Sequence, residues 1–137
     1  MLSPTASTVR LFLHVFASAV WVGGQFVVAG IVPGMRRAHP QALKTLAQGF
    51  GRVAWPAFAV VVVTGMWSLM EIDITATSSA YQVTIGVKIA FAIAAGMAAG
   101  VHAAGRSKLA VALGGALGAL FSVVALFLGM LLDTGGA

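Results

Sequence analysis

The sequence predicts an all-α integral membrane protein, a four-helix bundle with both termini on the outer side of the membrane. Of its 137 residues, 60% are hydrophobic and only 8% are charged, whereas roughly a quarter of the residues in soluble domains are charged. The mean hydropathy is +1.01. The apolar residues form four long continuous blocks and do not alternate as the strands of a membrane barrel do. We therefore expect one transmembrane domain over residues 1–137, surrounded by a lipid bilayer.

Each block is close to the ~20 residues that a helix needs to cross a bilayer. Pro33-Gly34 is expected to close the first span, and Pro56 to lie in the first turns of the second, where proline is tolerated. Gly105, Arg106 and Ser107 suit a tight turn between the last two spans. The expected spans are 9–32, 51–70, 82–104 and 110–132.

The first block has a second interpretation, as a signal peptide. Arg10 precedes an apolar stretch, and Ala17-Ser18-Ala19 resembles a cleavage site of the A-x-A type. The apolar run continues to Val32, however, which gives it full spanning length and favours a membrane helix.

The positive charges predict the orientation of the chain. Six cations flank the first and third connections, and cytoplasmic loops carry an excess of Lys and Arg. We expect these two connections to face the cytoplasm across the inner (plasma) membrane. The net charge of +5 is explained by this bias, so no nucleic-acid partner is expected. The cations are Arg36, Arg37, Lys44, Arg52, Arg106 and Lys108.

The first span carries a polar stripe. At 100° per residue, Arg10, His14, Ser18, Trp21 and Gln25 fall on one narrow face of the helix. Ionisable residues inside a span usually face other protein and often mark a functional site. His14 is therefore a candidate ligand or redox residue, the alternative being a hydrogen-bonded packing histidine. Hydrogen bonding between helices is the favoured interpretation for Ser18 and Gln25.

Other helices are expected to bring ligand-like groups to the depth of His14. His14 should lie about 7 Å inside the outer face at 1.5 Å per residue. Met66 and Met70 share one face of the second span at a similar depth, and Met130 on the fourth span is not far away. Lys88 either faces an anionic group, such as a haem carboxylate or an acidic substrate, or extends outward to the interface. For each methionine, apolar filling is the competing interpretation.

The other two histidines are expected to play different parts. His102 should lie roughly 21 Å further towards the cytoplasm than Lys88, so His14 and His102 are not expected to clamp one iron. We expect His102 to be interfacial and His39, beside Pro40, to be solvated.

Histidine with thioether sulfurs and no cysteine suits copper, and it also suits haem iron with one histidine ligand, either alone or with one methionine as the second axial ligand. We therefore expect a metal site of His14, Met66 and Met70 for copper, or a haem b site of His14, Trp21, Gln25 and Lys88, with haem slightly favoured. Hydrolytic motifs such as G-x-S-x-G and H-E-x-x-H are missing. No catalytic residue is assigned, and a redox or metal-binding membrane protein is favoured over a hydrolytic or group-transfer enzyme.

Three stretches resemble a known family. LHVFASAVWVGG, residues 13–24, resembles the first-helix signature of the CopD copper-resistance membrane domain. FGRVAWPAFAVVVVTGMW, residues 50–67, resembles that family's second helix with its late Thr-Gly, and residues 81–88 resemble the aromatic-to-lysine entry of its next helix. The plan is also similar, more weakly, to the HemJ-type four-helix haem proteins.

The resemblance implies that His14 serves a haem or copper site near the outer face, with Trp21 and the paired glycines shaping its wall. The expected function is then electron transfer or copper handling, with a membrane or outer-side protein partner. The alternative is a cofactor-free structural or assembly subunit of a larger complex, or a homo-oligomer, packed through small residues. The glycine pairs that would provide these small faces are Gly96 with Gly100 and Gly114 with Gly118.

Overall fold

The computed structural model describes residues 3–135. In this part of the chain there are four long helices, two short 3-10 helices and no strand. This confirms the all-α prediction. The elements in chain order are α1 (Ala6–Ala38), η1 (Pro40–Ala42), α2 (Leu43–Met70), η2 (Ile74–Ala76), α3 (Ser79–Ala104) and α4 (Lys108–Thr134).

All four long helices have the length and apolar composition of membrane spans. The mean hydropathy of the most apolar window in each lies between 1.8 and 2.4. Many large apolar side chains are exposed, as for Phe12, Val27, Val83 and Phe127, at 62% exposure or more. In a lipid bilayer such side chains would face hydrocarbon and not water. The protein is therefore a multi-pass membrane protein, with the four spans that a four-helix bundle requires.

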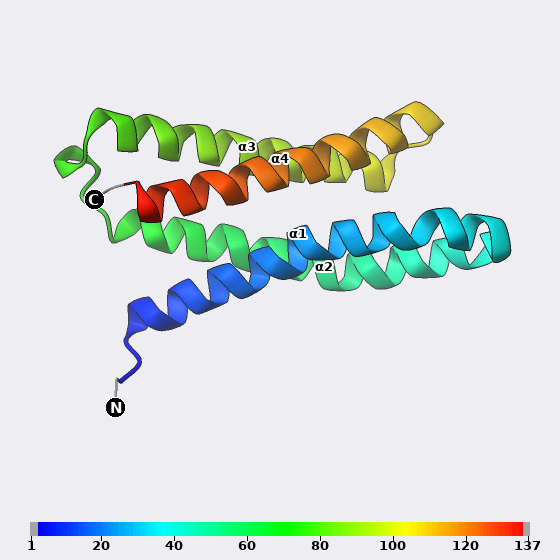
Figure 1. Cartoon of the computed structure of the whole chain (residues 1–137), viewed down its shortest axis with the longest axis horizontal. Coiled ribbons are helices and arrows are strands. Elements are labelled where there is room, and N and C mark those ends of the chain that lie inside the picture. The colour runs from blue at the N-terminus through cyan, green and yellow to red at the C-terminus, as the bar shows by residue number, and fades with distance from the viewer. Residues whose placement is uncertain (1–2, 136–137) are drawn as a thin grey trace. The chain divides into compact units, whose positions relative to one another are not determined.

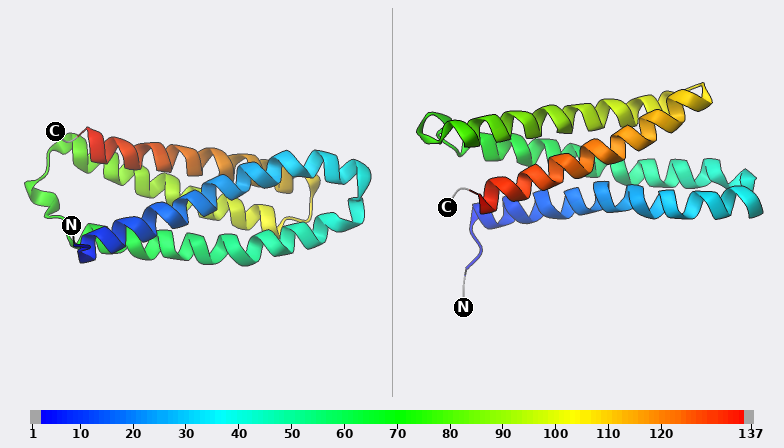
Figure 2. Two further views of the ribbon diagram at one scale, coloured as in Figure 1. Left: turned by 60° about the horizontal axis from the view of Figure 1, so that its bottom comes forward. Right: turned by 45° about the horizontal axis from the view of Figure 1, so that its top comes forward.

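The chain forms two compact units, residues 1–72 and residues 73–137. In the first unit α1 and α2 pack side by side as an antiparallel hairpin, and in the second α3 and α4 do the same (Figure 1). Both views in Figure 2 show the tight turns that close each hairpin.

The two prolines lie inside helices, which corrects the expectations for both. Pro33 does not close α1, because the helix continues to Ala38. Pro56 is not in the first turns of α2, because that helix already begins at Leu43. Spanning helices tolerate proline where neighbouring groups satisfy the freed backbone carbonyls. Arg36 and Arg37 in the last turn of α1 further favour the extension, since cations stabilise a helix C-terminus.

Side-chain caps explain why α1, α3 and α4 begin slightly before the expected spans. The hydroxyl of Ser78 accepts a hydrogen bond from the backbone N–H of Tyr81 at the start of α3. Ser107 does the same for Ala110 at the start of α4. At α1, Thr5 and Thr8 cap each other reciprocally. Such caps favour helix initiation in polar residues just outside an apolar run.

The α1–α2 hairpin packs around aromatic rings. The ring of Trp21 lies 4.6 Å from that of Phe58 and 5.7 Å from that of Trp55, measured between centroids. Gly24 of α1 leaves room for a ring of α2, since a Cβ there would come within 2.7 Å of Cε2 of Phe50. Large side chains thus fill the space between these two helices.

The α3–α4 hairpin packs through glycine instead. A Cβ at Gly114 would stand 2.7 Å from the backbone nitrogen of His102 and 2.8 Å from the carbonyl oxygen of Ala98. Gly118 faces the backbone of Ala99, at 3.4 Å. This confirms Gly114 and Gly118 as a small face for close helix packing. Gly100 does not share that role, because a Cβ there would meet no atom of the described chain within 4 Å.

Candidate functional site

His14 is bonded to the neighbouring helix of its own hairpin. Nδ1 of His14 on α1 lies 2.8 Å from the hydroxyl oxygen of Thr64 on α2. Thr64 is buried, with 3% of its surface exposed, and the His14 ring is partly buried. The edge of the imidazole also lies against the α2 backbone, since a Cβ at Gly65 would be 3.6 Å from Cε1 of His14. The histidine is therefore held in place from α2.

The surroundings of Thr64 assign the proton on His14. The Thr64 hydroxyl lies 2.6 Å from the carbonyl oxygen of Val60 and 3.2 Å from that of Val61, and it donates its single proton there. The same oxygen can then only accept from His14, so Nδ1 carries the hydrogen. In the neutral imidazole, Nε2 consequently carries the lone pair. This is the arrangement in which ligating histidines are usually oriented, with the second ring nitrogen donating to a protein oxygen.

Trp21 and Gln25 lie on α1 with His14. They follow Ser18 by about one and two helical turns. Trp21 is buried at 5% exposure within the aromatic cluster it forms with Trp55 and Phe58. The Gln25 side-chain amide donates to the backbone carbonyl of Trp21 at 3.0 Å. Trp21 of the predicted polar stripe therefore contacts α2. The Gln25 bond lies within α1, so the hydrogen bond between helices expected for Gln25 stays a prediction.

Met66 and Met70 are not brought to the His14–Thr64 contact. They are 59% and 85% exposed. Helical spacing puts them about 150° and 170° around α2 from the face, centred on Thr64 and Gly65, that touches His14. Within this hairpin the thioethers point away from the imidazole.

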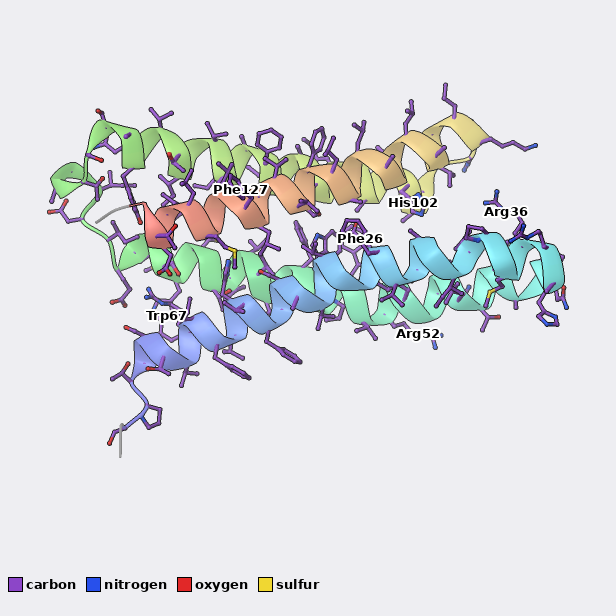
Figure 3. The ribbon with its side chains drawn as sticks, in the orientation of Figure 1. Phe26, Arg36, Arg52, Trp67, His102 and Phe127 are labelled. Carbon is purple, nitrogen blue, oxygen red and sulfur yellow. The ribbon has the colours of Figure 1, made fainter. Side chains whose placement is uncertain are left out.

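Lys88 and His102 belong to the α3–α4 hairpin. The Lys88 ammonium rests over a glycine of α4, where a Cβ at Gly129 would come within 3.0 Å of Nζ. Nδ1 of His102 lies 2.6 Å from the carbonyl oxygen of Val111 on α4, so this histidine donates to backbone. Figure 3 shows His102 toward the end of the hairpin where α3 turns into α4. Its observed contact is an interhelical packing bond at an exposed position.

Thr64 and Arg10 also belong to the surroundings of His14, although the sequence did not assign them to the site. Thr64 orients His14, and its only signal was its place in the Thr-Gly pair of the second span. Arg10 lies one turn before His14 on the polar stripe, and its Nε and Nη1 atoms are buried with no hydrogen-bond partner in the described chain. Arg10 as a whole is half-buried. Buried polar atoms without a partner are costly, so these two donor atoms are an unusual feature of the α1–α2 hairpin.

Known proteins do not decide what the site does. No protein-family model, curated protein or solved structure matches the chain. Within residues 3–135, no group of three or more His, Cys, Asp or Glu side chains lies close enough together to hold a metal ion. The geometry around His14 is therefore the basis for a functional hypothesis.

Proposed function

We propose that this protein binds haem b through Nε2 of His14 and serves electron transfer in the membrane, as a CopD-like protein. The observation that carries the proposal is the hydrogen bond from Nδ1 of His14 to Thr64, whose own proton is directed to Val60. A single imidazole with its lone pair on Nε2 is a donor that haem iron accepts. Haem would supply reversible one-electron chemistry.

The chain's own residues have separate tasks in this proposal. His14 provides the ligand atom, and Thr64 fixes the tautomer and the ring orientation. Trp21 and its aromatic neighbours exclude water on the cytoplasmic-facing side of the histidine, since Trp21 is nearly fully buried. Gln25 fixes the backbone behind Trp21.

Haem is preferred to copper because of the methionines. Cu(I) favours soft thioether ligands alongside histidine, and Met66 and Met70 lie around α2 from the His14 contact. The test is the visible spectrum and metal content of the protein purified in detergent from cells supplied with haem precursor and copper. We expect a Soret band and no stoichiometric copper. A protein with neither would overturn the proposal, and copper without haem would replace it with copper handling.

One observation favours a second candidate, a cofactor-free assembly subunit. The His14–Thr64 bond joins α1 to α2 just as the His102–Val111 bond joins α3 to α4. A histidine used only for packing would look the same in this respect. This candidate predicts co-purification with a larger membrane complex, no visible chromophore, and assembly that survives His14→Gln.

We further propose that the protein lies in the plasma membrane with the α1–α2 turn in the cytoplasm. Figure 3 shows Arg36 at that turn and Arg52 on the same half of α2, while Trp67 lies toward the other end. The chain contains no cysteine, so single cysteines can report sidedness. In intact cells, an impermeant maleimide should label Thr77→Cys and spare Gln41→Cys; the opposite pattern would reverse the orientation.

A further inference from the structure

We propose that Arg10 is a binding site for a carboxylate of the ligand held at His14, so that the protein selects haem with free carboxylates. This inference rests on the proposed haem function and goes beyond it by naming the group that Arg10 recognises. The observation behind it is that Nε and Nη1 of Arg10 are both buried and lack a hydrogen-bond partner in the described chain.

The cost of that burial calls for an anion. Arg10 is half-buried, and two nitrogens of its guanidinium are buried without a hydrogen-bond partner in the described chain. Buried donors without a partner are unfavourable, and the positive charge they share favours an anion as the partner. Arginine cannot lose its proton, so it cannot escape the cost by becoming neutral. An oxyanion from outside the chain is the simplest group that would satisfy both buried donor atoms.

None of the chain's side-chain carboxylates accepts a hydrogen bond from Nε or Nη1 of Arg10. There are three acidic residues in all. Glu71 accepts a hydrogen bond from the indole N–H of Trp67 at 3.1 Å. Asp73 accepts from both the hydroxyl and the backbone N–H of Thr75. Asp133 lies exposed near the end of α4.

The position of Arg10 favours the carboxylate of a ligand at His14. Residues four apart on a helix lie on one face with Cβ atoms about 5–6 Å apart, so Arg10 is the next residue of the stripe on the N-terminal side of His14. Arginine also binds carboxylates with fixed geometry and stronger, charge-assisted hydrogen bonds. A ligand with a metal centre at His14 and an acidic edge toward the start of α1 would use both residues.

The test compares haem b with its dimethyl ester, in which the carboxylates carry no charge. Both are titrated into the detergent-solubilised apoprotein, and dissociation constants are read from the Soret band. Wild type should bind haem about tenfold more tightly than the ester, the size expected for a charge-assisted hydrogen bond. Arg10→Gln should bind the two equally, and Arg10→Lys should keep part of the preference.

Controls separate this inference from the proposed function. Arg36→Gln, at the opposite end of α1, should keep the full preference, and His14→Ala should lose both ligands. If wild type binds neither compound, the haem proposal itself fails. If wild type binds both equally, or if the preference disappears in Lys88→Gln and persists in Arg10→Gln, the Arg10 inference alone is overturned.

Stability of the apoprotein distinguishes recognition from a structural role. An Arg10 that serves only packing would make Arg10→Gln less stable and weaken both compounds together, which would overturn the inference. An Arg10 that awaits an anion should leave the apoprotein's thermal midpoint unchanged or raised in Arg10→Gln. Native mass spectrometry tests a lipid as the partner. If wild type retains anionic lipid, Arg10→Gln does not, and the preference for haem over its ester is the same in both, the site binds a lipid phosphate and the haem carboxylate is rejected.

Discussion

The two hairpins of this protein each use one histidine to join two helices, but in different surroundings. His14 is partly buried, lies next to Arg10 on the polar stripe of α1, and bonds a buried threonine hydroxyl. His102 is exposed near the α3–α4 turn and bonds a backbone carbonyl of α4. Both donate from Nδ1, so hydrogen bonding alone does not separate a ligand from a packing residue. The difference is that His14 is oriented by a side chain, in a helix whose neighbouring polar residue, Arg10, has buried donors.

The largest expected effect comes from removing the two histidines in turn. His14→Ala should abolish the Soret band, because it removes the iron ligand. His102→Ala should keep the band, because the α3–α4 hairpin retains its glycine packing. The spectra of the two purified variants, normalised to protein, are the measurement. Equal loss in both variants would mean that the band depends on overall folding and would remove the distinction drawn between the histidines.

The second effect concerns the threonine that has no counterpart at His102. Thr64→Val keeps the shape and removes the acceptor for Nδ1 of His14. Loss of such an orienting partner typically weakens a bound metal centre about 10- to 100-fold, so haem affinity should fall by that factor. Thr64→Ser keeps the hydroxyl and should restore most of the affinity. An unchanged affinity in Thr64→Val would show that His14 needs no orientation from α2.

The third effect tests the glycine packing of α3 on α4. Gly114→Ala would push a methyl group against backbone atoms at 2.7 and 2.8 Å, so the helices must separate. We expect a loss of about 1–3 kcal/mol, the usual range for overpacking, measured by unfolding in mixed detergent micelles. The matched control is Gly100→Ala on α3, which meets open space and should be neutral or slightly stabilising. Equal losses in the two variants would contradict the close approach at Gly114.

The same substitution in the other hairpin should cost less. A methyl group at Gly24 meets the ring of Phe50, which can rotate, and not backbone. An off-rotamer side chain costs about 0.5–1.5 kcal/mol, so Gly24→Ala should lose no more than that. Gly23→Ala, with no atom of the described chain near its Cβ, is the control. A larger loss at Gly24 than at Gly114 would reverse the ranking of the two interfaces.

Much of the fold follows from the sequence because it depends on hydrophobicity alone. Four continuous apolar blocks predict four spanning helices from length and hydrophobicity, and this prediction does not depend on which face of each helix packs against its neighbour. The helix ends were harder. Proline marks a boundary in water, but Pro33 and Pro56 lie within longer helices here. The capping residues Ser78 and Ser107 were readable in principle, since serine before an apolar run is a common start signal.

The candidate site was predictable only in part. The sequence shows which residues share one face of a helix, but it does not show which residue of the neighbouring helix packs against that face. The stripe through His14 came from helical periodicity and needed no partner helix. Met66 and Met70 were assigned by depth alone, and depth does not say which side of α2 they occupy. Thr64 is only two residues before Met66, yet the rotation of 200° separates the two. Rotation about the helix axis is set by packing, as in the contact between Trp21 and Phe58.

The smallest effect concerns Asp73, which caps the short helix η2 just before the α3–α4 hairpin. The connection between α1 and α2 has no acidic residue. The hydroxyl of Thr75 donates to the Asp73 carboxylate at 2.6 Å, and its backbone N–H donates at 3.1 Å. These bonds, the hydroxyl first, hold the pKa of Asp73 below its ordinary value of 3.8. Because the folded pKa is lowered, the cap is fully present above that value and is lost as the pH falls through the folded pKa.

NMR titration of the carboxyl carbon should show this, with Thr75→Ala moving the pKa back up. Thr77→Ala should leave it in place, because that hydroxyl donates to the carbonyl of Ile74. Since Asp73 is fully exposed, the effect on overall stability should be small, and a titration unaffected by Thr75→Ala would assign the lowered pKa to something other than the cap.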